Sequence, residues 1–429
     1  MSAMAALASD PLRLPCGLML KNRLIKSAMT EKMAVNEQPT TDHQRVYKRW
    51  AQGGWAVLIT GNIMVDDKYL TSPGDVAVSG PDSTIIEGWT AWTKGVHEHG
   101  CHIIAQLNHP GRQSPLGAGK RGLLSKALAP SAIPLSLGDS WIAHVARAVV
   151  FGTPQAMTPD QIDDVIAQFT RAARLASRAG FDGVEIHAAH GFLLSQFLSS
   201  SSNKRSDEFG GSAEKRTGLV LRIMRAIRKE VPQSFCVGVK INAADHVNPG
   251  GFDEMLRQIE LIDKEKPDYI QLSGGSFEDP QVCTFELFST PMCTNLIVMA
   301  QMLSTRNSLP RIDTRAGRTI SREGFFIQAS TGIRRKFPHL LLIVTGGFRS
   351  REGVNNALKD GACDAIGLGR PAVKFPDLPN KIILNDDLGE EEARFDVEPA
   401  PVPGWIATKI RSVGAGAETK YYSSLLRQL

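Results

Sequence analysis

The stretch TPDQIDDVIAQFTRAARLASRAGFDGVEIHAAHGF, residues 158–192, contains a complete helix-then-strand unit followed by two histidines. A capping box with proline at the first helical position opens it at Thr158. Apolar residues then recur every three or four positions, so the spacing predicts a helix over residues 158–179 with one buried face. Gly180 ends that helix, and the apolar run Gly183–His187 predicts a buried strand directly after it.

The same alternation continues in both directions along the chain. Near-continuous apolar runs are typical of strands that are buried on both faces of a parallel sheet. Eight such runs are present, at Arg23–Ala28, Ala56–Gly61, His102–Leu107, Gly183–His187, Cys236–Ile241, Tyr269–Ser273, Leu340–Thr345 and Ala365–Leu368. The clearest helical patterns lie at residues 82–99, 158–179, 213–231, 251–264 and 350–360.

Eight β-then-α units predict an α/β fold of the (β/α)8 TIM barrel type. A doubly wound sheet uses the same alternation and is the alternative. The unit count favours the barrel, and no G-x-G-x-x-G follows the first strand. Because the chemistry of such barrels lies at the carboxyl ends of the strands, we expect the reactive residues there.

Three segments do not fit the repeat. Residues 110–157, after the third strand, are expected to form a lid over the barrel mouth. Residues 276–320, after the sixth strand, are open to three interpretations: a substrate-covering flap, a poorly packed insertion or an artefact of gene annotation. The last segment begins with a run of acidic residues and continues with a proline-rich sequence, neither of which fits the repeat. We therefore expect a barrel domain over residues 1–385 and a peripheral C-terminal extension over residues 386–429.

The composition is that of a globular protein, because 42% of the 429 residues are hydrophobic and 22% are charged. The net charge of +5 comes from scattered basic residues, so nucleic acid is not expected as a partner. No apolar run reaches the roughly 18 residues that a membrane span needs, and the first residues lack the form of a secretory signal. Six cysteines without a C-x-x-C pair predict no metal site and a reducing, cytoplasmic location.

Two histidines, His187 and His190, follow the fourth predicted strand. Two imidazoles at a strand end can point together into the barrel mouth, where they could donate hydrogen bonds to one substrate oxygen and withdraw electron density from it. A zinc pair is an alternative, although no third ligand with suitable spacing is evident. A structural role for one histidine is the simplest alternative.

Glycine-rich turns follow the last two predicted strands, as TGGFRS at residues 345–350 and GLGRP at residues 367–371. Glycines let backbone amides approach an anion closely, and these two loops form the usual phosphate site of this barrel. The two turns together predict a phosphorylated ligand or cofactor. Polar residues, which a packed core would not favour, also lie at the ends of other predicted strands. They are Thr30, Asn62, Gln106, His109, Lys240 and Asn242.

Several blocks of the sequence resemble the old yellow enzyme family of FMN-dependent ene reductases and NADH:flavin oxidoreductases. The most specific block is GFDGVEIHAAHGFLLSQFL, residues 180–198, followed by NKRSDEFGG, residues 203–211. KNRLIKSAM, AQLNHPGR, GVKIN, IVTGGFR and DAIGLGRP are also similar and occur in family order, so the resemblance covers about residues 14–383.

The resemblance implies a barrel that binds FMN and uses NADH or NADPH as reductant. Thr30 would contact the flavin near O4, Gln106 its pyrimidine edge, and Lys240 the region of N1 and O2. The other cofactor-binding positions would be Ala28, Met29, Asn62, Gly347, Phe348, Arg349, Gly369 and Arg370, the last five of them around the phosphate. The implied partner is a small-molecule substrate, with a homodimer left open.

The implied activity is reduction of the C=C bond of an α,β-unsaturated carbonyl compound, by ping-pong hydride transfer through flavin N5. His187 and His190 would hold the carbonyl oxygen, while Phe192 and Asn242 would line the pocket. The family usually has a tyrosine proton donor at the position of Phe192, and Tyr69 is one candidate substitute. An NAD(P)H oxidase and a flavin-dependent dehydrogenase or isomerase of a specialised metabolite are therefore alternatives, as is a flavin-free barrel that binds a phosphorylated ligand.

Overall fold

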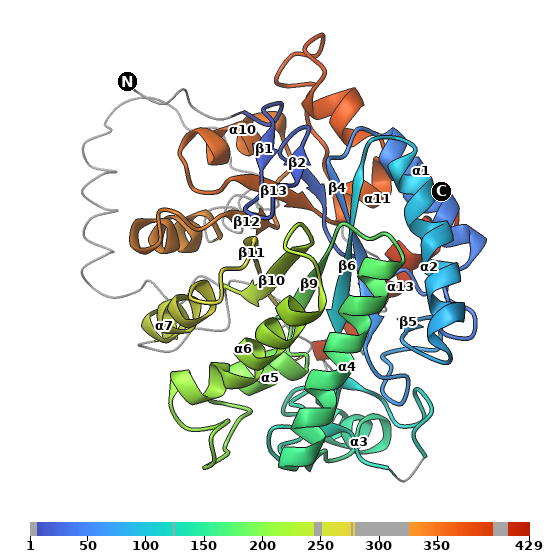
Figure 1. The fold of residues 1–429 in the computed structure, drawn as a ribbon, viewed down its shortest axis with the longest axis vertical. Coiled ribbons are helices and arrows are strands. Elements are labelled where there is room, and N and C mark those ends of the chain that lie inside the picture. The colour runs from blue at the N-terminus through green and yellow to red at the C-terminus, as the bar shows by residue number, and fades with distance from the viewer. Residues whose placement is uncertain (1–6, 123–124, 244–250, 276–277, 279–325, 398–410) are drawn as a thin grey trace.

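The computed structural model describes residues 7–122, 125–243, 251–275, 278, 326–397 and 411–429. Within them, eight parallel strands close into a barrel that helices surround (Figure 1), and β3 closes it by pairing with both β13 and β4. The barrel strands are β3 (Leu24–Lys26), β4 (Val57–Met64), β6 (His102–Asn108), β9 (Gly183–Ala188), β10 (Cys236–Asn242), β11 (Tyr269–Ser273), β12 (Leu342–Thr345) and β13 (Ala365–Leu368). The predicted TIM barrel is confirmed.

The eight predicted strands are all present, with ends that differ from the predicted ones by at most three residues. The largest difference is in β4, which continues to Met64 and pairs at its end with the short strand β5 (Val76–Ala77). Its register against β6 shifts between Ile59 and Asn62. Such an irregularity re-aims side chains at a strand end, and here it sets Asn62 opposite Gln106.

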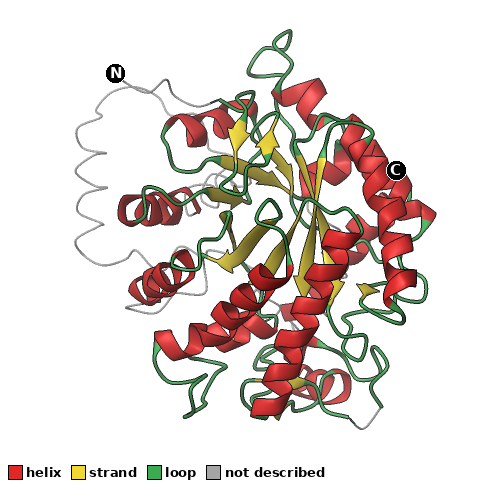
Figure 2. Cartoon of the chain, viewed as in Figure 1, coloured by secondary structure: helices red, strands yellow, loops and turns green. Residues whose placement is uncertain are grey.

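Helices pack around the outside of the barrel (Figure 2). They are α1 (Thr41–Gln52), α2 (Asp82–His97), α4 (Pro159–Arg178), α6 (Ala213–Glu230), α7 (Gly251–Asp263) and α10 (Arg351–Lys359). The five predicted helices are confirmed, and α4 has the predicted capping box between Thr158 and Gln161. The sequence analysis did not identify α1, although Val46, Tyr47 and Trp50 bury one of its faces. None of the helices in the described ranges is long and apolar enough to cross a membrane.

The amino end of the barrel is filled by apolar side chains under an N-terminal hairpin. The hairpin pairs β1 (Leu12–Arg13) with β2 (Met19–Leu20) in antiparallel fashion. Leu14 and Leu20 pack with the inward-facing residues Ile25, Ile104 and Ile343 in one buried cluster. The polar residues that the sequence analysis selected lie towards the carboxyl ends of the strands instead.

The segment after the third barrel strand has its own short elements: η1 (Gly111–Gln113), β7 (Leu128–Ala129), α3 (Trp141–Val150) and β8 (Gln155–Ala156). β7 pairs with β8 and contacts α5 (Leu193–Leu198), the helix directly after the two histidines. The segment therefore lies beside the carboxyl end of β9. The candidate flap at residues 276–320 lies outside the described residues except for Glu278, whose carboxylate is 2.6 Å from Arg112 Nη2.

The C-terminal segment ends in α13 (Arg411–Leu426), in which Tyr422 and Leu426 are buried. α13 contacts α11 (Arg370–Lys374), the short helix after β13. Ser423 Oγ donates a hydrogen bond to the Thr30 carbonyl at 2.9 Å, and Arg427 Nη2 donates to the Lys32 carbonyl at 2.8 Å. The domain division at residue 385 stays a prediction, but this helix packs directly on the loop that follows β3.

The close packing of the barrel interior can be tested at Gly367 in β13. A Cβ there would lie 2.0 Å from Thr345 Oγ1 and 2.4 Å from Ser27 Oγ. We expect Gly367→Ala to lower the free energy of unfolding by about 1–3 kcal/mol, because overpacking a dense interior costs that much. Gly95→Ala on α2 is the control, since a Cβ there meets nothing within 4 Å. Denaturant unfolding measures both variants, and equal stability of Gly367→Ala and the wild type would contradict the packing.

Candidate functional site

Polar side chains gather where the barrel strands end. In the register of the sheet, Asn62 on β4 lies opposite Gln106 on β6, and Gln106 lies opposite Glu185 on β9. On the other side of β9, His187 lies opposite Lys240 on β10. Residues that the sequence analysis selected from separate strands are therefore neighbours at one rim of the barrel.

The two histidines are in direct contact. His187 Nε2 lies 2.9 Å from His190 Nδ1, His187 Nδ1 lies 2.9 Å from Asn62 Oδ1, and His190 Nε2 lies 2.9 Å from Ser273 Oγ. An amide oxygen accepts only, so a neutral His187 donates from Nδ1 and accepts at Nε2 from His190. His190 then accepts at Nε2 from the Ser273 hydroxyl. We call this the histidine chain: Asn62, His187, His190 and Ser273.

Both imidazoles are neutral in this setting. Burial lowers the pKa of His187 well below its ordinary value, and the neighbouring His190 and Lys240 lower it further. Burial, together with the charge of Lys240, lowers the pKa of His190 to about 3. A neutral imidazole has one N–H, so each histidine can turn one hydrogen bond towards a ligand. Within the described residues, neither histidine belongs to a group of three side chains that could hold a metal ion.

The backbone at His190 has a left-handed conformation with a φ of 58°. Non-glycine residues adopt this conformation at a cost of roughly 1–2 kcal/mol, so the surrounding contacts must hold it. The His190 N–H donates to Asn242 Oδ1 at 3.2 Å, and Gln113 Nε2 donates to the His190 carbonyl at 2.8 Å. Phe192 immediately precedes α5, and its ring centroid lies 4.8 Å from that of His187. Together, these contacts direct the His190 ring back towards His187.

Below the histidines, Glu185 is fully buried among hydrogen-bond donors. Gln106 Nε2 donates to Glu185 Oε1 at 2.6 Å, and the Tyr269 hydroxyl donates to Oε2 at 3.1 Å. In the amide orientation that satisfies its neighbours, Gln271 also donates to both Glu185 oxygens. Burial raises the pKa of Glu185, and the charge of Lys240 opposes that shift. Burial lowers the pKa of Lys240, and the charge of Glu185 opposes that shift.

The turns after β12 and β13 offer backbone donors. Gly346 and Gly347 have φ values of 128° and 86°, which glycine adopts without strain. Gly369 approaches Met29 so closely that a Cβ there would lie 3.1 Å from the Met29 sulfur. The backbone amides of Gly347 and Phe348 donate to none of the described residues. Unengaged amides in a glycine turn are suited to bind an anion.

Two arginines lie beside these turns and next to α13. Arg370 Nη1 is 2.6 Å from Glu418 Oε1 on α13. Tyr422, one turn further along α13, has its pKa influenced by the charges of both Arg370 and Arg349, although burial is the largest influence and raises it. Phe348 is buried, so its backbone and not its ring is available to a ligand. Both predicted phosphate-binding arginines therefore influence the same residue of α13.

The remaining predicted cofactor positions lie in the loop after β3. Ala28 packs on the apolar interior, Met29 lies at Gly369, and Thr30 is partly exposed with its carbonyl bound by Ser423. The rim thus offers the side-chain amide of Gln106 and the amino group of Lys240. The turns after β12 and β13 add backbone amides without partners among the described residues, together with Arg349 and Arg370. FMN has carbonyl groups on one edge of its ring system and a phosphate at its other end, so the residues present fit it.

Tyr69 makes its ring contacts with His109 and Arg121. Its ring centroid is 5.1 Å from that of His109, and Arg121 lies over its face. Burial raises the pKa of Tyr69. No contact between Tyr69 and either His187 or His190 occurs in the described part of the chain. Its role as a proton donor stays a prediction.

Sequence reasoning missed Ser273, Glu185 and Gln271. Ser273 is a polar residue at the end of a predicted strand, and the criterion that selected Asn62 and Asn242 would have found it. Glu185 and Gln271 lie inside their strands, where an apolar run shows burial but not which neighbours face the same interior. The closed barrel brings them together.

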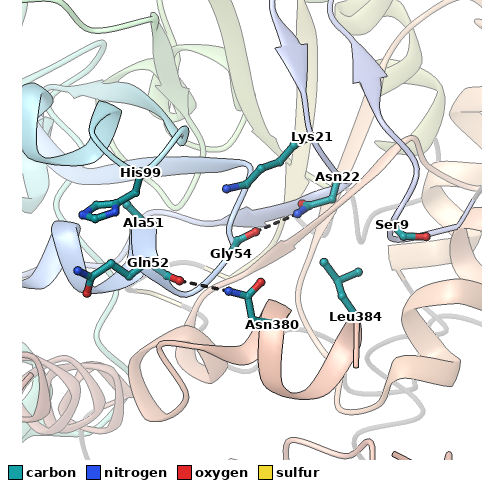
Figure 3. Close-up of a pocket in the computed structure, with 9 residues that line it drawn as sticks. All are labelled: Ser9, Lys21, Asn22, Ala51, Gln52, Gly54, His99, Asn380 and Leu384. Atoms are coloured by element: carbon teal, nitrogen blue, oxygen red, sulfur yellow. Dashed lines mark hydrogen bonds between the residues drawn. The ribbon is translucent and has the colours of Figure 1, made fainter. Parts of the chain in front are cut away.

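A hollow of about 390 Å³ lies at the opposite, amino end of the barrel (Figure 3). Its lining includes Asn22, Gly54 and His99, which precede barrel strands. Figure 3 shows Asn22 bound to the Gly54 carbonyl and Asn380 bound to the Gln52 carbonyl, so the chain itself engages these amides. None of the predicted site residues lines this hollow.

Comparison with known proteins identifies relatives along almost the whole chain. The NADH:flavin oxidoreductase / NADH oxidase family matches residues 10–281. The chain is 41% identical over 413 residues to the NADH-dependent flavin oxidoreductase iliE of Hypocrea jecorina (strain QM6a), covering 96% of each protein. It is 38% identical over 398 residues to the NADH-dependent flavin oxidoreductase iccE of Talaromyces variabilis, covering 92% of this chain and 90% of that one.

Solved structures show the same fold. The old yellow enzyme homologue from Zymomonas mobilis superimposes with a TM-score of 0.67 at 22% identity, covering 97% of this chain and 99% of that one. Morphinone reductase superimposes with a TM-score of 0.66 at 22% identity, covering 88% and 90%. The protein therefore belongs to the NADH:flavin oxidoreductase / NADH oxidase family, with the old yellow enzyme barrel, and is an oxidoreductase whose cofactors are FMN and a nicotinamide dinucleotide.

Proposed function

We propose that the enzyme uses NAD(P)H to reduce the C=C bond of α,β-unsaturated carbonyl compounds, with His187 and His190 binding the carbonyl oxygen. The observation that carries the proposal is the histidine chain. It sets two neutral imidazoles against each other at the carboxyl rim of the barrel, where substrates of this fold bind. A carbonyl oxygen that enters between the rings accepts hydrogen bonds from both, and these strengthen as negative charge develops on it.

The tautomers follow from this geometry. His190 donates to the oxygen from Nδ1, the atom that now faces His187. For His187 to donate from Nε2, its Nδ1 must accept, so the Asn62 amide turns its nitrogen towards that atom. Asn242 and Gln113 keep the His190 backbone in place throughout.

The cofactor site extends from the same rim. Gln106 and Lys240 would hold the pyrimidine edge of FMN, Thr30 would lie on its O4 side, and the Gly347 turn with Arg370 would bind its phosphate. When bound, FMN supplies the hydride chemistry between the nicotinamide and the substrate. The charge of Lys240 would stabilise negative charge on the ring system, and the charge of Glu185 raises the pKa of this lysine against the effect of burial.

Phe192 favours a second candidate function. Its ring lies against His187 and has no proton to donate, and both histidines have pKa values well below neutrality. Alkene reduction here takes the proton that follows hydride transfer from water. An NAD(P)H oxidase, dehydrogenase or isomerase reaction needs no donor at this position and is the alternative.

The first experiment follows the flavin anaerobically. We expect NADH or NADPH to reduce the flavin and cyclohexenone to reoxidise it promptly. We expect Phe192→Tyr to accelerate the reoxidation by about 10²-fold, the lower end of what a positioned general acid contributes, and to leave reduction by NAD(P)H unchanged. A flavin that stays reduced in both proteins until oxygen is admitted would contradict ene reduction and support an oxidase.

His190→Ala tests the oxygen-binding role. We expect the dissociation constant of a phenolic ligand to rise about 10-fold, the worth of roughly one hydrogen bond to a charged or developing charged oxygen, with FMN still bound. His190→Asn should recover most of the affinity, because asparagine tolerates the left-handed backbone and its amide donates. Titration of the flavin absorbance measures both. Unchanged affinity in His190→Ala would show that this ring does not face the ligand.

Arg370→Ala tests the phosphate site. We expect the dissociation constant for FMN to rise by about 10- to 100-fold, because a charge-assisted hydrogen bond to phosphate contributes about 1.5–3 kcal/mol. Arg394→Ala, at an exposed position, is the control. Flavin fluorescence during dialysis reports FMN loss, and full retention by Arg370→Ala would remove this arginine from the site.

A further inference from the structure

A second cluster of reactive side chains lies at the amino end of the barrel. Cys16 lies in the turn of the β1–β2 hairpin, Cys236 is the first residue of β10, and Asp268 immediately precedes β11. The two sulfur atoms and a carboxylate oxygen of Asp268 all lie within 4.8 Å of one another. Residues more than 200 positions apart are therefore brought together where the hairpin covers the barrel.

The two thiols differ in accessibility. Cys236 is fully buried, whereas Cys16 is partly exposed. The Cys16 thiol forms a hydrogen bond with Cys236. That bond lowers the pKa of Cys16, and burial raises the pKa of Cys236 well above its ordinary value. Cys101 and Cys363 are buried, and burial raises their pKa values, that of Cys101 to about 12. Among these four cysteines, Cys16 is the one suited to react first.

The cluster is poorly suited to a metal ion. Asp268 Oδ2 already accepts hydrogen bonds from Arg228 Nη2 and from the Val237 N–H, both at 2.7 Å. A guanidinium group bound to the carboxylate repels a cation and competes for the same oxygen. The chemistry that remains is that of two adjacent thiols.

We propose that Cys16 and Cys236 form a disulfide when the protein meets a hydroperoxide. The Cys16 thiolate attacks the O–O bond, which breaks to give a Cys16 sulfenic acid and an alcohol, or water from hydrogen peroxide. The Cys236 thiol then attacks the sulfenic sulfur and displaces its hydroxyl as a second water. Two thiols are oxidised by two electrons, and the peroxide is reduced by the same two.

Local structure permits the sulfurs to close to bonding distance. Gly17, next to Cys16, has a φ of 97°, and a Cβ added there would meet no atom within 4 Å, so the chain beside Cys16 is not packed against other side chains on that face. The bond would join the hairpin covalently to β10. Since Leu14 and Leu20 of that hairpin cover the apolar barrel interior, oxidation would fasten this cover and raise the melting temperature of the enzyme.

The test uses the full-length holoenzyme with EDTA present. The protein is reduced, freed of reductant, exposed to hydrogen peroxide, alkylated and mapped by non-reducing peptide mass spectrometry. We expect a peptide pair joined through Cys16 and Cys236 with the loss of two hydrogens, and a higher melting temperature that dithiothreitol reverses. The same result is expected with Cys283 and Cys293 replaced by serine.

Two variants test the order of the steps. Cys16→Ser should abolish the cross-link and leave Cys236 unoxidised, while Cys236→Ala should leave a Cys16 sulfenic acid that dimedone labels. Cys101→Ser is the matched control, expected to cross-link like the wild type. The proposal is overturned if peroxide leaves both thiols free to alkylation, if Cys16 pairs with another cysteine, or if dimedone labels Cys236 in Cys16→Ser. A folded, flavin-loaded spectrum for each variant ensures that these outcomes report on the thiols.

Discussion

The pairing of β3 with both β13 and β4 is the constraint on which the rest of the structure depends, because it closes a parallel sheet into a barrel. In a closed parallel barrel, every carboxyl end reaches the same rim and alternate side chains face one shared interior. Asn62, His187 and Ser273 come from three separate strands, yet they form one hydrogen-bonded chain at that rim. At the amino end, the N-terminal hairpin covers an interior filled by apolar side chains, so the candidate site residues meet at the other end of the barrel.

In the polar half of the barrel interior, buried polar and ionisable groups are paired with one another. Gln106 and Tyr269 donate hydrogen bonds to the buried Glu185, Gln271 does so in its alternative amide orientation, and the charge of Lys240 opposes the rise in pKa that burial causes. A buried charge without partners would be expensive, so this network lets an ammonium group remain beneath the strand ends. That positive charge also contributes to keeping the two histidines neutral, which makes them donors to a ligand rather than acids.

The C-terminal helix adds a contact that the barrel repeat does not require. Ser423 binds the backbone of Thr30, Arg427 binds that of Lys32, and Glu418 pairs with Arg370. The helix therefore touches both the loop after β3 and the start of α11, which are the two sides of the proposed cofactor site. Its composition is not strongly patterned, and its position follows from contacts with residues almost 400 positions earlier in the chain.

The sequence by itself determined the eight strands, five of the barrel helices and the histidine pair, because local periodicity, the Thr158 capping box and strand-end polarity are properties of neighbouring residues. It also carried the family resemblance that the comparisons confirmed. The tertiary structure alone decided that Ser273 completes the histidine chain, that Glu185 lies beneath it and that Cys16 meets Cys236. The physical reason is that each of these contacts joins residues from different strands or loops. Their distances are set by the closure and register of the barrel, which no local pattern encodes.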